Sequence, residues 1–531
     1  MTHLAVSIFV RSLEPALADA VRAAEFGAEM VEYRIDRFAD DFDAVAALVA
    51  RSPVPCIVTC RPTWEGGEYE GDEPHRHALF EHLAAATHPP AYLDIELLAW
   101  QRSPNLRDTL GPRVNTAAGP GLILSSHDFD QRPRDLLQKL EQLADEPHAR
   151  VIKLAWHARS LRDNLEAFEI IQQQYKPTIA LCMGQFGLPS RVLAKKFAGL
   201  LSFAALDADA ATAPGQPTLH DVKHLYRWDS LRRDTAVYGV IGWPVGHSLS
   251  PALHNAGFDA IDYNGVYLPM PIPPEYEHFK ATVGAWLDFA PLHFRGASVT
   301  IPHKENLLRF VRHRGGEIEP LAEMIGAANT LTVLPDGSLY ASNTDYAAAL
   351  DAVCDSLGVS RERMAGQRVG LIGAGGAARA IAAGFAGYGA AVTVYNRTLD
   401  RAAAMADDLN ARLQQLTGSA QPAGQVHAQP LDRLTAGGCD IYINCTPIGM
   451  HPHVDASPLG DADTIAGWGE STVVFDTIYN PAKTKLLQQA KAAGCVTISG
   501  TEMFVRQGAA QFELWTKQPA PRGVFHKVMQ R

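Results

Sequence analysis

The stretch VIKLAWHA, residues 151–158, indicates the fold of the first half of this 531-residue chain. Most of it is apolar, which predicts a buried β-strand, yet Lys153 lies inside it. Burial is costly for a charged ammonium group, so a lysine is rarely found there. A buried lysine that reacts as the neutral amine can attack a carbonyl carbon and form a Schiff base. The stretch therefore predicts both a strand and a reactive amine.

Short apolar segments like this one recur on both sides of it. They are LAVSIFV from Leu4, MVEYRID from Met30, CIVTCR from Cys56, YLDIEL from Tyr92, GLILSSHDF from Gly121, TIALCMG from Thr178 and LLSFAAL from Leu200. Amphipathic helical patterns such as PALADAVRAAEFG lie in most of the gaps. Eight β/α units within residues 1–230 predict a TIM barrel. An open doubly wound sheet would need a phosphate-binding glycine loop after an early strand, and this half of the sequence has none.

Polar residues collect at the carboxyl ends of these predicted strands, where TIM barrels carry their active sites. They are Glu32, Arg34, Arg61, His127 and Lys153. Glu32 and Arg34 are two positions apart on one strand, so their side chains share a face. Such a cluster around a lysine indicates a site for a carbonyl substrate.

The neighbouring residue types suit Schiff-base chemistry. His127 is a candidate proton carrier, and Glu65 in RPTWEGGE could orient its imidazole. Three arginines could hold a carboxylate or a polyol: Arg34, Arg61 and Arg191. Together these residues predict a Schiff-base lyase or an aldolase.

Six motifs in this half resemble the type I 3-dehydroquinate dehydratases, in order and across residues 1–230: VEYRIDRF, CRPTWEGGE, SSHDF, IKLAW, CMGQFGLPSR and TAPGQ. The resemblance implies metal-free dehydration of 3-dehydroquinate to 3-dehydroshikimate. Lys153 would form the imine, His127 would move the protons, and Glu65 would align His127. The implied substrate contacts are Glu32, Arg34, Arg61, Met183, Arg191, Thr212 and Gln216. Thr212 stands where the family more often has serine. The EGGE and APGQ segments disfavour the alternative of an aldolase.

The second half of the chain has a different pattern. After the turn-rich segment 212–218, LHDVKHLYRW predicts the last barrel helix, and DSLRRDT is a polar linker. Residues 235–342 mix strands and helices, and C-terminal helices in 501–531 could pack back on this region. The family resemblance given below implies that it is a substrate-binding domain completed by those helices. Residues 343–500 predict a dinucleotide-binding domain.

That last domain contains the segment LIGAGGAARA, which places glycines between a predicted strand and a predicted helix: Gly373, Gly375 and Gly376. Amide groups at such a helix start can hold a pyrophosphate, so the segment predicts a Rossmann-type site. The following strand ends in Asn396-Arg397-Thr398 instead of an acidic residue. An arginine flanked by small polar residues suits a 2′-phosphate, which predicts NADP as cofactor.

Residues 236–520 resemble the shikimate dehydrogenases through GHSLSPALHN, SVTIPHKEN, GAANTL, SNTDY, INCTPIGM, DTIYNPAKTKLL and GTEMFVRQGAAQFELW. Lys304 and Asp345 suit proton transfer to or from an alcohol, and the resemblance implies that they are the catalytic pair. The implied substrate contacts are Ser248, Ser250, Thr300, Asn329, Asp345, Tyr479 and Gln507. The implied cofactor contacts are Gly373, Ala374, Gly375, Gly376, Ala377, Asn396, Arg397, Thr398, Thr446 and Met503.

Two positions in this half stay open. Ser250 followed by Pro251 also fits a helix N-cap with proline in the first turn. Tyr346 stands where the resembling family usually has glycine, directly after Asp345. A large side chain there could shift substrate preference or slow closure of the site.

Composition narrows the class of protein further. A net charge of −11 disfavours nucleic acid and anionic membranes as partners. No run of apolar residues approaches the 18 that a membrane-spanning helix needs. The first residues do not resemble a signal peptide, and the seven cysteines are scattered without a zinc spacing. We expect a cytoplasmic enzyme with reduced thiols, no metal, small-molecule substrates, and a monomeric or homodimeric state.

The predicted fold class is therefore α/β, a TIM barrel followed by a two-domain shikimate dehydrogenase with a Rossmann-type NADP-binding domain. The chain is similar to the bifunctional dehydratase–dehydrogenases of plants, in which the product of one half is the substrate of the other. One alternative is the same barrel fused to a quinate/shikimate dehydrogenase that works catabolically. A regulatory protein that only binds the metabolites is disfavoured, because Lys153, His127, Lys304 and Asp345 are all present.

Overall fold

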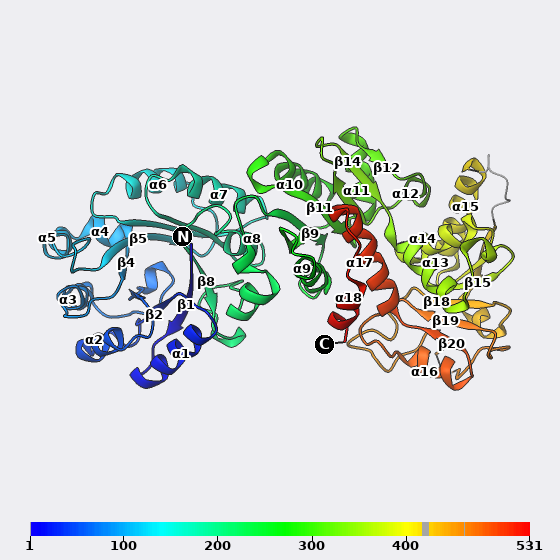
Figure 1. Ribbon diagram of the computed structural model, residues 1–531, viewed down its shortest axis with the longest axis horizontal. Coiled ribbons are helices and arrows are strands. Elements are labelled where there is room, and N and C mark those ends of the chain that lie inside the picture. Colours follow the sequence, from blue (N-terminus) through cyan, green and yellow to red (C-terminus); the bar gives the residue numbers. More distant parts are fainter. Residues whose placement is uncertain (1, 417–423, 461, 531) are drawn as a thin grey trace. The chain divides into compact units, whose positions relative to one another are not determined.

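The computed structural model describes residues 2–416, 424–460 and 462–530 (Figure 1). The chain divides into two compact units. The first comprises Met1–Val237, Asn264–Ile272 and Ala281–Phe294, and the second comprises Tyr238–Tyr263, Pro273–Lys280 and Arg295–Arg531.

Eight parallel strands form the barrel of the first unit, in the order β7-β6-β5-β4-β3-β2-β1-β8. They are β1 (His3–Phe9), β2 (Met30–Arg34), β3 (Cys56–Thr59), β4 (Tyr92–Glu96), β5 (Gly121–Asp128), β6 (Val151–His157), β7 (Thr178–Met183) and β8 (Leu201–Ala205). The first and last strands of this order, β7 and β8, also meet: the amide of Leu200, just before β8, donates to the carbonyl of Thr178 in β7 at 2.8 Å. The predicted TIM barrel is confirmed, and the eight apolar segments are its strands.

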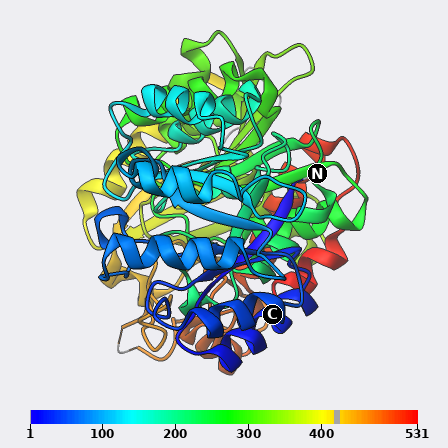
Figure 2. The same cartoon turned by 90° about the vertical axis from the view of Figure 1, so that its left-hand side faces the viewer.

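Helices alternate with these strands and surround them, as Figure 2 shows for the blue-to-cyan part of the chain. They are α1 (Leu13–Glu25), α2 (Phe42–Ala50), α3 (Glu73–Ala84), α4 (Leu97–Arg102), α5 (Pro104–Leu110), α6 (Leu136–Asp145), α7 (Asp163–Gln173) and α8 (Leu188–Val192). Side-chain caps begin several of them; Asp41, for example, accepts from the amide of Ala44 at the start of α2.

The last barrel helix differs from the prediction. Residues Asp221–Leu225 form a short π-helical turn, in which the amide of Tyr226 donates to the carbonyl of Asp221. Arg227 then adopts a positive φ of 57°, and this left-handed residue ends the turn. The helix predicted over LHDVKHLYRW is therefore present, but it is shorter than predicted.

A network of buried charges lies within the barrel wall. Asp94 and Glu96 are two positions apart on β4 and are fully buried. Arg61, after β3, donates to Asp94 at 2.9 Å and to Glu96 at 2.7 Å. Arg76, from α3, donates to the other oxygen of Glu96 at 2.6 Å. Buried ionic groups are tolerated when each is paired in this way.

A mixed sheet of six strands follows, in the order β10-β9-β11-β13-β14-β12. Its strands are β9 (Ala236–Gly242), β10 (Gly265–Pro271), β11 (Phe294–Val299), β12 (Glu317–Ile318), β13 (Thr330–Val333) and β14 (Leu339–Ser342). The helices in this region are α9 (Ser250–Ala260), α10 (Tyr276–Asp288), α11 (Lys304–His313) and α12 (Pro320–Ile325).

The third sheet is parallel and has the strand order of a Rossmann fold, β17-β16-β15-β18-β19-β20. Its strands are β15 (Arg368–Ile372), β16 (Ala391–Asn396), β17 (Val426–Pro430), β18 (Ile441–Asn444), β19 (Val473–Asp476) and β20 (Val496–Ile498). Its helices are α13 (Thr344–Leu357), α14 (Gly376–Gly387), α15 (Leu399–Leu416) and α16 (Lys485–Ala492). The predicted Rossmann-type sheet is confirmed.

The last two helices are α17 (Gly500–Thr516) and α18 (Arg522–Val528). They return to the mixed sheet. Gln511 of α17 accepts from the hydroxyl of Ser298 at 2.7 Å and donates to that of Thr330 at 3.1 Å. The indole of Trp515 donates to the carbonyl of Leu331 at 3.0 Å.

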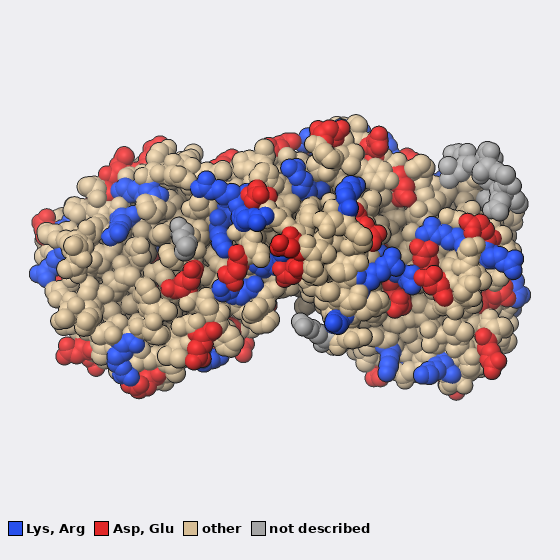
Figure 3. Space-filling view, in the orientation of Figure 1, with Lys and Arg blue, Asp and Glu red and all other residues tan. Residues whose placement is uncertain are grey.

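The surface carries both signs of charge. On the face drawn in Figure 3, basic and acidic side chains are interspersed. Among the residues that the structure describes, no helix is long and apolar enough to cross a bilayer. The same residues include no group of three or more His, Cys, Asp or Glu side chains that could hold a metal ion.

The shared partner of the two barrel arginines gives a stability prediction. Glu96→Ala removes the buried carboxylate with which the guanidinium groups of both Arg61 and Arg76 pair. We expect the free energy of unfolding of the barrel to fall by about 3–5 kcal/mol, measured by urea denaturation. Glu14→Ala is the matched control, because Glu14 pairs with Arg51 on the exposed surface and should matter little. Equal losses in the two variants would contradict the argument.

Candidate active sites

One pocket at the carboxyl ends of the barrel strands collects nearly all the residues predicted for the first site. Its lining includes Glu32, Arg34, Arg61, His127, Lys153, Met183, Arg191, Thr212 and Gln216. Glu65, which is absent from this lining, lies behind His127 and touches it. Ser7, Phe129, Ala155, Leu181, Phe203 and Ala213 complete the pocket wall. The structure thus brings together residues from seven of the eight strands or the loops that follow them.

Lys153 lies on β6 with 5% of its surface exposed. Its Nζ is 2.7 Å from Oδ2 of Asp94 and 3.4 Å from Oε1 of Glu32. Nζ also lies 4.5 Å from the centre of the Phe203 ring. Besides the apolar strand that carries it, two carboxylates and an aromatic face surround the amine.

Asp94 is a site residue that sequence reasoning missed. It joins Lys153 to Arg61, and it also accepts from the hydroxyl of Ser125 at 2.6 Å. Burial alone would raise its pKa, but the charges of Arg61 and Lys153 hold the pKa of Asp94 well below its ordinary value. An acidic residue inside the apolar segment YLDIEL was the available signal, the same one that drew attention to Lys153.

His127 and Glu65 form a second buried pair in this pocket. Oε1 of Glu65 accepts from the backbone amide of His127 at 2.8 Å and lies 3.0 Å from its Nδ1. Burial, together with the charges of Arg61 and Lys153, holds the pKa of His127 well below its ordinary value. Burial also raises the pKa of Glu65 to about 8. With Nδ1 held by Glu65, Nε2 is the nitrogen left to act as a base.

Arg191 is the cation in the pocket best suited to bind an anion. It is almost fully buried, and burial lowers its pKa to about 10. Its Nε and Nη2 atoms have no hydrogen-bond partner among the described residues. A buried guanidinium with unused donors is costly unless a ligand completes it. A substrate carboxylate would supply the missing acceptors in bidentate geometry.

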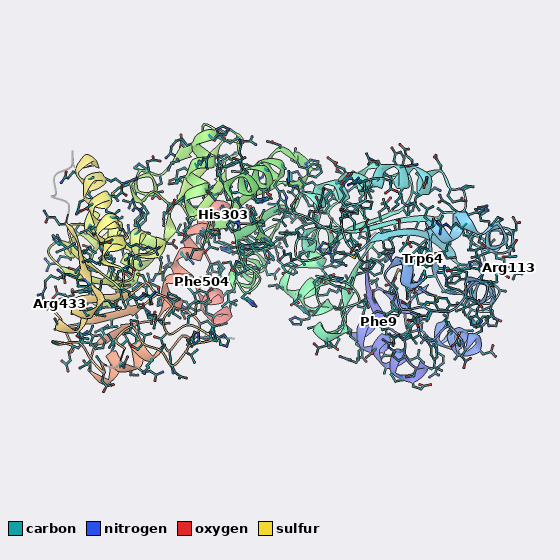
Figure 4. All side chains as sticks on the ribbon, turned by 180° about the vertical axis from the view of Figure 1, so that it is seen from behind. Phe9, Trp64, Arg113, His303, Arg433 and Phe504 are labelled. Atoms are coloured by element: carbon teal, nitrogen blue, oxygen red, sulfur yellow. The ribbon has the colours of Figure 1, made fainter. Side chains whose placement is uncertain are left out.

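A second pocket, of about 300 Å³, collects all the residues predicted to contact the substrate of the other half. Its lining includes Ser248, Ser250, Thr300, Lys304, Asn329, Asp345, Tyr479 and Gln507. Sequence reasoning missed four polar or aromatic members of the wall: His247, Ser298, Phe504 and Gln511. Figure 4 shows Phe504 on the C-terminal helix α17, and its ring contacts that of Tyr479 at 4.6 Å between centroids.

The predicted catalytic pair of this half is in direct contact. Nζ of Lys304, the first residue of α11, donates to Oδ2 of Asp345 at 2.6 Å. Asn329 donates to the other carboxylate oxygen at 2.9 Å. Asp345 occupies the first turn of α13, where the helix dipole favours a negative charge. These two contacts therefore orient the carboxyl group before any substrate arrives.

Ser250 is not a helix N-cap. Leu249 holds the N-cap position of α9, and Ser250 is the first helical residue. The hydroxyl of Ser248 accepts from the amide of Ser250 at 3.2 Å. Both serines line the second pocket, so the alternative of a purely capping serine is not supported.

The glycine turn between β15 and α14 has the geometry of a phosphate cradle. Gly373 has a φ of 104°, and a Cβ there would meet Cγ2 of Thr446 at 2.8 Å. In contrast, a Cβ on Gly375 or Gly376 would meet nothing within 4 Å. The chain thus leaves open space beside the start of α14, and a helix N-terminus can hold a pyrophosphate.

The other predicted cofactor residues are distributed around this turn and the neighbouring strands. Ala374 and Ala377 belong to the turn and the first turn of α14, and Asn396 ends β16. Asn396 donates to the carbonyl of Thr398 at 2.8 Å, while the side chain of Arg397 is exposed. Met503 lies on α17 and is buried in the core of this domain. An exposed arginine beside a hydroxyl at this strand end suits a 2′-phosphate, so the residues present fit NADP.

The two sites make this protein an enzyme with two catalytic halves, a barrel lyase joined to a dinucleotide-dependent dehydrogenase. Sequence comparison agrees. The family model of type I 3-dehydroquinase matches residues 4–233. The models of the shikimate dehydrogenase substrate binding domain, shikimate/quinate 5-dehydrogenase and the shikimate 5′-dehydrogenase C-terminal domain match 240–331, 358–423 and 500–530.

Relatives of known function cover both the whole chain and its second half. The bifunctional 3-dehydroquinate dehydratase/shikimate dehydrogenase of Arabidopsis thaliana, described as chloroplastic, is 35% identical over 540 residues, covering 99% of this chain and 83% of that protein. The NADP(+) shikimate dehydrogenase of Methanosarcina acetivorans is 40% identical over 295 residues, which cover 55% of this chain and 97% of the relative. A crystal structure of a shikimate dehydrogenase with NADP+ matches 56% of this chain and 96% of its own, with 34% identity and a TM-score of 0.50.

The chain belongs to the family of bifunctional 3-dehydroquinate dehydratase/shikimate dehydrogenases. The predicted family, the enzyme class and the cofactor NADP are thereby confirmed.

The pair of His127 and Glu65 predicts how dehydratase activity depends on pH. Burial lowers the pKa of His127 and raises that of Glu65 to about 8. On the hypothesis that Nε2 of His127 is the catalytic base, an ionised Glu65 fixes the imidazole proton on Nδ1 and leaves Nε2 free to act. Since a group with this pKa becomes about tenfold more ionised between pH 7 and 9, kcat/KM for 3-dehydroquinate should rise about tenfold over that range. Glu65→Gln keeps an oxygen acceptor but cannot ionise, so its profile should be flat there. An unchanged rise in this variant would rule out Glu65 as its source.

Proposed function

We propose that the barrel dehydrates 3-dehydroquinate to 3-dehydroshikimate and that the second half reduces 3-dehydroshikimate to shikimate with NADPH. One observation carries the proposal: two complete sets of residues, each suited to one step, converge on two separate pockets. The order of the halves fits, because the product of the first reaction is the substrate of the second.

In the barrel, Lys153 is the proposed nucleophile. It reacts as the neutral amine, so a proton must first leave an ammonium group that Asp94 and Glu32 contact. The amine adds to the ketone carbon of 3-dehydroquinate, and loss of water gives an imine. The imine draws electrons from the adjacent carbon and makes its C–H bond acidic. Arg191 binds the substrate carboxylate.

His127 moves the proton in this proposal. Nε2 takes it from the carbon next to the imine, and the electron pair moves toward the imine nitrogen. The protonated imidazole then gives the proton to the departing hydroxyl group, which leaves as water. Glu65 stabilises the charged imidazolium between these two transfers. Addition of water to the imine releases 3-dehydroshikimate and restores Lys153.

In the second half, Lys304 and Asp345 are the proposed catalytic pair. NADPH, held by the turn at Gly375 and by Arg397, supplies the hydride when it is bound. The ammonium of Lys304 donates a proton to the substrate oxygen, and Asp345 holds that ammonium in place at 2.6 Å. Asn329 fixes the aspartate, while Ser248, Ser250 and Thr300 line the same pocket and bind the hydroxyls and carboxylate of the substrate.

We also propose the working domains and the compartment. The dehydratase occupies 1–230, the substrate domain 235–342 with 501–531, and the NADP domain 343–500. The contacts of Gln511 and Trp515 with the mixed sheet support the assignment of the last helices. All seven cysteines are free thiols, which suits a reducing compartment such as the cytoplasm.

A single assay tests the two-step reaction. With 3-dehydroquinate and NADPH, the unmodified protein should oxidise NADPH continuously. Lys153→Ala and Lys304→Ala should each lose this activity by at least about a thousandfold, because each removes a reacting group. Added 3-dehydroshikimate should restore NADPH oxidation in Lys153→Ala only. Activity on 3-dehydroshikimate without any on 3-dehydroquinate in the unmodified protein would contradict the role given to the barrel.

Arg397 tests the preference for NADP. Arg397→Ser removes the cation proposed to face the 2′-phosphate, so kcat/KM for NADPH should fall about ten- to a hundredfold while that for NADH changes little. Arg363→Ser is the matched control, because Arg363 is exposed and lies before β15, at the opposite end of the sheet from the glycine turn. Equal losses with both cofactors would assign Arg397 another role.

A further inference from the structure

Tyr346 follows Asp345 in the first turn of α13. Its side chain contacts Glu319, a residue outside all the motifs of the sequence analysis. The hydroxyl of Tyr346 donates to Oε1 of Glu319 at 2.9 Å. The other oxygen of Glu319 accepts from the backbone amide of Asn343 at 2.9 Å. A carboxylate from a different part of the chain thus connects two residues that flank the catalytic aspartate.

This arrangement completes the N-terminus of α13. In a capping box, an acidic side chain at the third helical position accepts from the amide of the N-cap residue. Here Asn343 is the N-cap and Tyr346 holds that third position, so the acceptor is missing from the helix itself. Glu319 supplies it from outside, and Tyr346 fixes the orientation of Glu319.

The N-cap in turn fixes Asp345. The side-chain oxygen of Asn343 accepts from the amide of Asp345 at 3.0 Å, and its amide nitrogen donates to the carbonyl of Ala327 at 2.9 Å. Glu319 is itself anchored, because its amide donates to the carbonyl of Ala341 at 2.9 Å. Glu319 immediately precedes α12, so one carboxylate joins the starts of two helices at the site.

The ring of Tyr346 provides a second anchor. A Cβ on Gly384 of α14 would come within 3.0 Å of Cβ and 3.2 Å of Cδ2 of Tyr346, so the ring packs directly on that glycine. Because α14 begins at the glycine turn, the same tyrosine contacts the helix that follows the cofactor cradle. Burial and the nearby Glu319 raise the pKa of Tyr346, so its hydroxyl keeps its proton and remains a donor.

We propose that Tyr346 and Glu319 are positioning residues of the dehydrogenase, which act as one unit to hold the turn that carries Asp345. The inference rests on the proposed Lys304–Asp345 pair and deepens it. Neither residue is itself among those that line the substrate pocket, so their effect passes through Asn343 and Asp345. An error of about 1 Å in such a turn is enough to slow a proton transfer substantially.

The test is a double-mutant cycle on shikimate oxidation with NADP+. Tyr346→Phe keeps the ring and removes the hydroxyl, and Glu319→Ala removes the carboxylate. We expect kcat to fall about tenfold in each variant and about tenfold in the double variant, since loss of either residue disables the same unit. KM values for shikimate and NADP+ should stay within about twofold, because no substrate contact is lost.

Three controls make the outcome decisive. Tyr388→Phe removes another tyrosine hydroxyl near α13, one that accepts from Arg361 and does not contact Glu319, so kcat should be unchanged. Dehydratase activity in the same preparations confirms that each variant is folded. Unchanged kcat in both single variants, or multiplied losses in the double variant, would overturn the proposal. An active Lys304→Ala would instead overturn the catalytic pair, and it is measured separately.

Discussion

The barrel site depends on keeping a set of opposite charges paired away from water. Lys153, Arg61 and Arg76 lie against Glu32, Asp94 and Glu96, and each of the six is almost fully buried. Removing one member takes a partner away from a buried charge, which is more costly than replacing a whole pair. The pairing also demands a fixed strand register, because Glu96, Ser125 and Lys153 lie level with one another across β4, β5 and β6. A shift of one residue would turn these side chains to the other face of the wall.

Each of the two proposed sites contains a lysine paired with an aspartate, but the structural settings of the two pairs differ. In the barrel, Lys153 and Asp94 project from neighbouring parts of one rigid sheet, and the charge network fixes both. In the dehydrogenase, Lys304 and Asp345 lie in the first turns of two helices, and Asn329 and the Asn343 cap hold the aspartate by hydrogen bonds. The first setting suits a lysine that forms a covalent bond. The second suits a lysine that passes a proton and depends on the position of its aspartate. Tyr346 and Glu319 are the residues proposed to hold that aspartate in place.

The sequence predicted the parts of this structure that have a local signal. Lys153 stood out because a charge interrupts an apolar strand, and the glycine turn stood out because a strand precedes it and a helix follows. Asp94 and Glu96 carried the same signal as Lys153 within YLDIEL, and it was overlooked. Glu319 had no such signal: it lies 27 residues before Tyr346, and only the folded chain brings the two together. The π-helical turn at Asp221–Leu225 was not predicted from the sequence either.

The glycine turn shows how a structure separates what the fold requires from what a ligand requires. Gly373 is explained by the chain alone, because its positive φ and the nearby Thr446 leave no room for a side chain. Gly375 has an ordinary backbone, with φ −97° and ψ −175°, and open space where a Cβ would stand. Neither the backbone conformation of Gly375 nor its surroundings require a glycine. A Cβ on Gly376 would also meet no atom within 4 Å. The absence of side chains at these two positions lets a molecule approach the amides closely, as the pyrophosphate of the proposed cofactor site would.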